Sequence, residues 1–97
     1  ANLARATLSV AGLARADLRR AVLREGKLDD ANLTDAKLGQ AFLVKADFTG
    51  ARLVGADLAA AKARDAIFYG ASLVRAQFGQ AELWGADFRK ADLTDAD

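Results

Sequence analysis

The sequence has no cysteine, histidine, proline or methionine, and its 97 residues include one tryptophan and one tyrosine. Without cysteine there is neither a disulfide framework nor thiolate chemistry. Without histidine the chain lacks the side chain that proteins use most often for acid–base catalysis and metal binding. The formal net charge is +1, whereas a nucleic-acid-binding protein usually has a clear basic excess. We therefore expect no enzyme activity and no direct binding to nucleic acid.

Long apolar runs are also absent. Hydrophobic residues make up 53% of the chain, but no run approaches the ~20 consecutive apolar residues that span a membrane. No signal peptide is recognisable, so with the lack of cysteine we expect a cytoplasmic protein without membrane contact. Because position 1 is not methionine, we expect residues 1–97 to be a single domain from a longer chain or an excised fragment.

What fills the chain is a five-residue repeat of the form Ala-polar-Leu/Phe-x-x. The third position of the repeat occurs nineteen times, from Leu3 to Leu93, and holds fourteen leucines, four phenylalanines and Ala63. The first position occurs twenty times and holds nineteen alanines and Gly26. Every leucine of the chain lies in one of the five possible phases, which indicates a structural period and not a bias of composition.

A period of five suits neither an α-helix nor a straight strand. On a helix the leucines would drift by roughly 140° per repeat, and on a strand they would alternate between faces. A corner after every repeat removes the conflict, because each Ala-x-Leu segment then faces the same axis. Four corners close a coil of twenty residues, and coils stack about 4.8 Å apart as parallel strands do. The sequence thus predicts an all-β solenoid of about five coils.

Side chains twenty residues apart should then lie above one another. Phe48, Phe68 and Phe88 would form one inward column of stacked rings. One outward column alternates in charge: Arg5, Glu25, Lys45 and Asp65. Opposite charges on neighbouring strands stabilise a sheet modestly, so both columns support the twenty-residue coil.

The repeat resembles that of the pentapeptide-repeat family, with units such as Ala16-Asp17-Leu18, Ala31-Asn32-Leu33 and Ala56-Asp57-Leu58. The resemblance covers essentially the whole chain. It implies a right-handed quadrilateral parallel β-helix with four repeats per coil. It also implies one functional alternative, because some members protect DNA gyrase from quinolone-type drugs as acidic, dimeric DNA mimics. This chain differs from them in its slight positive charge and in lacking an evident dimerising C-terminal helix.

Three features depart from a uniform repeat. Gly26 replaces an inward alanine, which predicts either a tighter coil or a bulge. Ala63 replaces an inward leucine, which predicts a thin or locally distorted core. The glycines at the fifth position predict type II turns, since such turns need a positive φ there: Gly50, Gly55, Gly70 and Gly85.

The outward positions carry the candidate sites. Exposed aromatic and aliphatic side chains often mark contact surfaces, and the possible interface residues are Val22, Phe42, Val44, Ile67, Tyr69 and Trp84. A possible basic patch for phosphate or an acidic partner comprises Arg19, Arg20 and Arg24. The alternative is that both sets are ordinary surface residues. We predict no catalytic, cofactor-binding or metal-binding residue and no cofactor.

Three functions remain open from the sequence. The first is a non-enzymatic structural or protein–protein interaction scaffold, whose partner is an unknown protein or a second copy bound through the ends or the apolar faces. The second is a DNA-mimic inhibitor of gyrase or a drug-resistance protein. The third is an engineered repeat scaffold, which the unbroken phase would suit.

Overall fold

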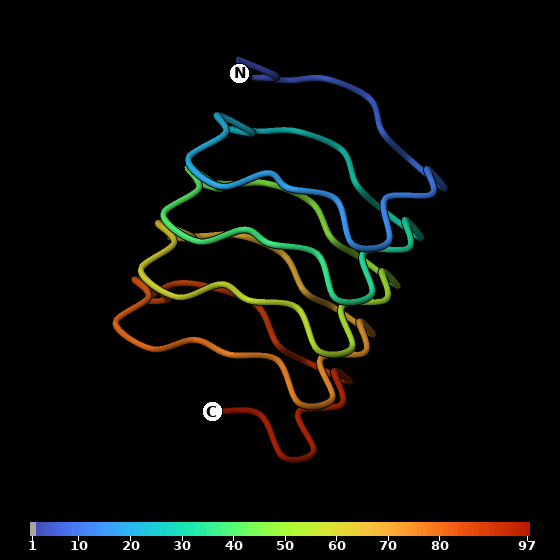
Figure 1. Cartoon of the computed structure of the whole chain (residues 1–97), viewed down its shortest axis with the longest axis vertical. Coiled ribbons are helices and arrows are strands. Elements are labelled where there is room, and N and C mark those ends of the chain that lie inside the picture. The colour runs from blue at the N-terminus through green and yellow to red at the C-terminus, as the bar shows by residue number, and fades with distance from the viewer. Residues whose placement is uncertain (1) are drawn as a thin grey trace.

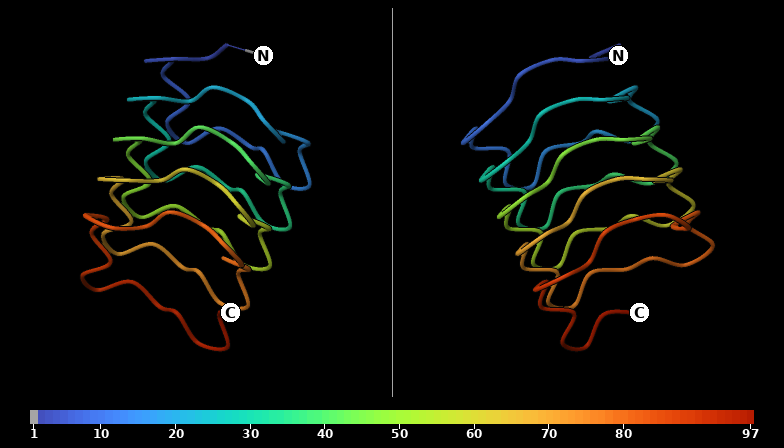
Figure 2. Two further views of the ribbon diagram at one scale, coloured as in Figure 1. Left: turned by 90° about the vertical axis from the view of Figure 1, so that its left-hand side faces the viewer. Right: turned by 180° about the vertical axis from the view of Figure 1, so that it is seen from behind.

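The structure, a computed structural model that describes residues 2–97, is a stack of nearly identical four-sided coils (Figure 1). Parallel bridges join each side to the side twenty residues later, from Asn2↔Val22 to Ser72↔Asp92. A turn occupies the fourth and fifth positions of every complete repeat in the described chain. The corners line up from coil to coil in all the views, and the two termini lie at opposite ends of the stack (Figures 1 and 2). The predicted twenty-residue coil is therefore confirmed.

Regular secondary structure is minimal, because a corner after every fifth residue leaves no room for more. Residues 2–97 contain no helix, and each side contributes a single bridge residue, the second of its repeat, instead of a longer strand. The described chain accordingly has no helix that would be long and apolar enough to cross a membrane. The coil is held by backbone hydrogen bonds that recur from repeat to repeat wherever a neighbouring coil is present.

The repeat 31–35 illustrates this pattern of backbone hydrogen bonds. The N–H groups of Leu33 and Asp35 donate to carbonyls of the next coil, at 2.7 and 2.9 Å. The N–H of Asn32 donates to Ala11 O in the preceding coil at 2.9 Å, and the N–H of Ala36 closes the corner onto Leu33 O at 3.0 Å. Four of the five N–H groups of a repeat are thus bonded to backbone, and only the N–H at the fourth position is left over.

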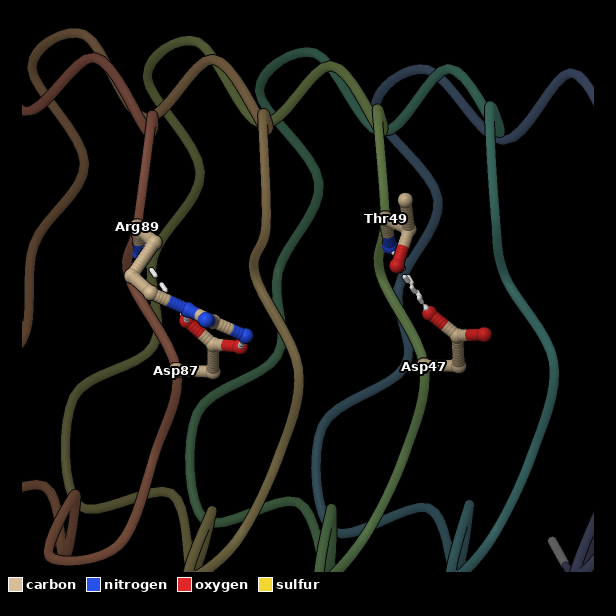
Figure 3. Close-up of polar contacts among 4 residues, drawn as sticks. All are labelled: Asp47, Thr49, Asp87 and Arg89. Atoms are coloured by element: carbon tan, nitrogen blue, oxygen red, sulfur yellow. Dashed lines mark hydrogen bonds and ion pairs between the residues drawn. The ribbon is translucent and has the colours of Figure 1, made fainter.

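Side chains at the second position supply the missing acceptor. Wherever this position of a complete repeat is Asp or Asn, its Oδ1 accepts the N–H two residues later, at 3.0–3.2 Å. The residues are Asn2, Asp17, Asn32, Asp47, Asp57, Asp87 and Asp92. Figure 3 shows two of them on the same side of the stack, Asp47 with Thr49 and Asp87 with Arg89. The short polar residue of the motif therefore caps the corner that follows it.

The fifth position has a positive φ at every corner. The four corner glycines have φ between 67° and 80°, as the type II prediction requires. Fifteen non-glycine residues at the same position also have φ between 56° and 63°. The turn conformation is thus imposed by the coil and not by glycine. Val10, with φ 63°, is the most unfavourable case, because a β-branched side chain rarely tolerates this region.

The core is purely apolar and lies on the axis of the coil. No polar or charged side chain is buried among the described residues, and first- and third-position side chains from Ala21 to Ala76 are almost fully shielded. The rings of Phe48, Phe68 and Phe88 stack 5.0 Å apart and within 3° of parallel, which confirms the predicted column. The leucines of the first coil are only partly buried, and Leu93 is 42% exposed, because a neighbouring coil covers these layers on one side only.

The two irregular positions are absorbed without a break in the hydrogen bonds. Ala63 is fully buried and its N–H bonds to Glu82 O at 2.8 Å. The next bond of the same repeat, from Asp65 N–H to Trp84 O, is 3.3 Å long and longer than its equivalents, so the predicted distortion is small and lies at the corner after Ala63. Phe68 and Phe78 in the same coil meet edge to face, with centroids 6.4 Å apart, and fill the axis beside it. At Gly26 the bulge is absent, since its N–H closes the turn onto Leu23 at 2.8 Å, shorter than at the other corners. The coil tightens there.

Candidate functional site

The outward aromatic residues each lie beside a cation from an adjacent coil. Lys62 Nζ is 5.4 Å from the ring centroid of Phe42, and Arg64 Cζ is 5.0 Å from that of Trp84. Tyr69 has Arg89 at 5.6 Å and Lys90 at 5.8 Å, the latter from the following repeat position. These cation–π contacts follow from the twenty-residue stacking, which sets residue 62 against residue 42.

The six predicted interface residues do not form one patch. Val22 and Phe42 are bridge partners in adjacent coils, and Val44 follows on the same side. Trp84, 68% exposed, lies two coils beyond Val44 in the same column, with Arg64 between them. The structure therefore separates a Val22–Phe42–Val44 cluster from Trp84 by a row that contains Lys62 and Arg64.

Ile67 and Tyr69 lie on the adjoining side of the coil. Ile67 bridges Asp47 and Asp87, one coil on either side, and it is 37% exposed. Tyr69 is partly buried and its ring is flanked by the two cations described above. These two residues form a separate and smaller apolar surface.

The arginines of the predicted basic patch differ in whether they pair with a carboxylate. The Arg19 guanidinium pairs with Asp17 in a two-pronged contact, at 2.8 and 2.7 Å. This hydrogen bond lowers the pKa of the Asp17 carboxyl well below its usual range. Arg20 and Arg24 are in no ion pair, because within residues 2–97 ion pairs join only Arg19 to Asp17 and Arg89 to Asp87. The alternating charges twenty residues apart are therefore not in direct ion pairs within residues 2–97.

A hollow brings part of the basic patch to Phe42. Arg20, Gln40, Phe42, Ala60 and Lys62 line a depression of about 380 Å³ at the corner between residues 20 and 22 and the corresponding residues of the next coils. A smaller depression of about 280 Å³ adjoins it and shares Arg20, Gln40 and Ala60 with it. We call the two adjoining depressions together the corner groove. Arg24 lies outside it, in a neighbouring depression with Val44 and Lys45.

Sequence reasoning missed five residues of the corner groove, namely Gly39, Gln40, Ala59, Ala60 and Lys62. Each lies one or two coils from a residue that the sequence did single out, since the first four follow Arg19 and Arg20, and Lys62 follows Phe42, at steps of twenty. Applying the coil period to the outward positions would have found them. Among residues 2–97 no group of three or more carboxylate, histidine or cysteine side chains is placed to hold a metal ion.

Comparison with known proteins supports the five-residue repeat and the coiled structure described above. The family model for pentapeptide repeats matches in eight copies over residues 1–40, 27–62, 41–76 and 71–97. No curated protein matches significantly.

Several solved structures are similar to this chain over nearly its whole length. A crystal structure of the pentapeptide repeat protein Rfr23 from the cyanobacterium Cyanothece 51142 is 30% identical, with a TM-score of 0.74. A pentapeptide repeat protein from the thylakoid lumen of Arabidopsis thaliana is 32% identical, with a TM-score of 0.67. HetL from Nostoc, which is involved in the regulation of heterocyst differentiation, is 32% identical, with a TM-score of 0.57. Each match covers 99% of this chain but 58%, 63% and 48% of the respective relative.

Proposed function

Because the chain belongs to the pentapeptide-repeat family, we propose that it is a non-enzymatic scaffold module that binds another protein through its outward side chains. One observation supports this most directly: the inward positions alone make the core, and no polar side chain of the described residues is buried in it. The outward positions are therefore free to vary without loss of the fold. The right-handed sense of the coil, which the family resemblance implies, is part of the proposal.

The experiment places a photo-crosslinking amino acid at outward positions of the intact protein in cells. Position 42 lies beside the corner groove, and position 72 lies on the opposite side of the coil as the matched control. We expect a defined protein to be crosslinked from position 42 and not from position 72. Equal labelling from both positions would contradict the proposal, as would a turnover activity that depends on an outward carboxylate.

Self-association is the second form that this interaction can take. Phe42 is 39% exposed and Trp84 is 68% exposed, and such side chains are common in interfaces. Light scattering over a range of concentrations distinguishes the two forms. A mass that rises with concentration and falls back in Phe42→Ser or Trp84→Ser would assign the contact to a second copy. A constant monomer mass would assign it to a different protein.

A further inference from the structure

We propose that the corner groove binds an acidic peptide segment in which an apolar side chain stands beside carboxylates. This inference rests on the proposed function as an interaction module and names the chemistry of its partner. It is drawn from the shape of the groove, the charges that line it and the exposed ring of Phe42.

The groove exists because small residues follow Arg19 and Arg20 in their columns. Gly39 and Ala59 lie one and two coils beyond Arg19, and Ala60 lies two coils beyond Arg20. The stem of Arg19 lies over Gly39, with Cγ 3.9 Å from the point that a Cβ on Gly39 would occupy. Larger residues at these positions would fill the depression, so its floor depends on the small side chains.

The groove is lined by cations and by no carboxylate. Arg20 and Lys62 line its larger part, and Arg19 lines the smaller part. Arg19 is neutralised by Asp17, whereas Arg20 and Lys62 are in no ion pair within residues 2–97. A guanidinium and an ammonium group that are in no ion pair are suited to the carboxylates of a ligand.

Phe42 supplies the apolar part of the site. It is 39% exposed and forms part of the wall of the groove, while Lys62 lies over its ring. Ala60 contributes a methyl group to the floor. A ligand side chain such as leucine can therefore contact Phe42 and Ala60 while its neighbouring carboxylates reach Arg20 and Lys62.

The charge of the remaining surface favours a short acidic peptide over a nucleic acid. The groove contains three cations, whereas the net charge of the whole chain is +1. The remaining residues therefore have a negative net charge. A nucleic acid needs many basic contacts along its phosphates, and beyond the groove the neighbouring depression adds only Arg24 and Lys45 as cations. An acidic segment of a few residues would stay within the positive region.

Fluorescence anisotropy with a labelled peptide of Glu, Asp and Leu tests the inference. Lys62→Gln and Arg20→Gln should each weaken binding by about 2- to 5-fold, the range for an exposed ion pair. Arg52→Gln removes another exposed cation, on the opposite side of the coil, and should leave binding unchanged. Ala60→Asn should weaken binding by filling the floor, with no loss of folding midpoint, because Asn tolerates a positive φ better than Ala.

Three results would overturn the inference. The first is equal binding by Lys62→Gln, Arg20→Gln and Arg52→Gln variants. The second is equal binding of a control peptide in which Lys replaces Glu and Asp. The third is tighter binding of a single-stranded oligonucleotide of the same charge, which would assign the groove to nucleic acid. If position 42 crosslinks to a protein but the acidic peptide does not bind, the proposed function stands and this inference is wrong.

Discussion

The carboxylate of Asp35 occupies the space that a Cβ atom on Gly55 would need, one coil further along the chain. The same relationship joins Asp30 to Gly50 and Asp65 to Gly85. The aspartates and the glycines all have positive φ at the fifth position. Gly70 differs, because Gly50 precedes it in the column and a Cβ there would meet open space. At these three corners the aspartate of the preceding coil therefore leaves room only for glycine.

Gly55→Ala should therefore destabilise the protein more than Gly70→Ala. Both substitutions place a Cβ at a positive φ, which costs about 1–2 kcal/mol. Gly55→Ala must also push the Asp35 carboxylate out of its rotamer, at an additional cost of about 0.5–1.5 kcal/mol. Urea denaturation of the two variants measures the difference. The extra cost should vanish in an Asp35→Ala background, and its persistence there would contradict the stacking relationship.

The capping of corners predicts that Asp47→Ala costs about 1 kcal/mol, as the loss of a helix N-cap does. Asp47 Oδ1 accepts both the N–H and the hydroxyl of Thr49, at 3.0 and 2.6 Å. Asp47→Asn keeps this acceptor and should be close to the original protein in its unfolding free energy. Arg52→Ala, at the second position of the next repeat, removes no cap and serves as the control. An Asn variant as unstable as the Ala variant would disprove the capping role.

Acid should weaken the coil over a defined pH window. The hydrogen bond from the Arg89 side chain lowers the pKa of Asp87 from 3.8 to about 2, and the hydrogen bond from Thr94 lowers the pKa of Asp92. A carboxyl whose pKa is lowered by folding stabilises the folded state above its unfolded pKa. This contribution is lost as the pH falls from about 4 through about 2. Denaturation midpoints across this window should decrease, and less so in Asp87→Asn, which keeps the acceptor but cannot titrate. A midpoint that stays constant or rises on acidification would contradict the assignment.

Restoring leucine at position 63 should destabilise the protein even though leucine is the usual residue there. Phe68 and Phe78 of the same coil already meet across the axis, so a third large side chain would overpack this layer by about 1–3 kcal/mol. Ala63→Leu should lower the unfolding free energy less in a Phe78→Leu background, because leucine at position 78 leaves room for the leucine at position 63. Calorimetric midpoints of the two single variants and the double variant measure this coupling. A stabilising Ala63→Leu substitution would show that the layer is underfilled.

The sequence predicted the coil because its main determinant is periodic. The phase of Leu33 and its equivalents determines which side chains face the axis, and the five-residue step determines where corners fall. The way in which neighbouring residues accommodate an unusual residue was not predictable from the period. The consequence of Ala63 depended on how Phe68 and Phe78 share one layer, and the corner conformation of Val10 depended on the coil overriding a residue preference.

The sequence predicted only some residues of the candidate site and did not predict their arrangement. Phe42 and Arg20 were both identified from the sequence, but as members of different sets. Their proximity depends on the small side chain of Ala60 and on the side chain of Lys62, which covers the Phe42 ring. The separation of Trp84 from Phe42, by contrast, follows from the coil period alone, because position 84 lies two coils beyond position 44.

Inward side chains build the fold, which leaves the outward side chains free for interaction. Chemical denaturation of Leu33→Asp and Thr34→Asp tests it with the same substitution at adjacent residues. Leu33 is 0% exposed in mid-stack, so a carboxylate there should unfold several coils, because a buried unpaired charge is strongly unfavourable. Thr34 is partly exposed, and its substitution should shift the midpoint only slightly. Equal shifts in the two variants would contradict the account.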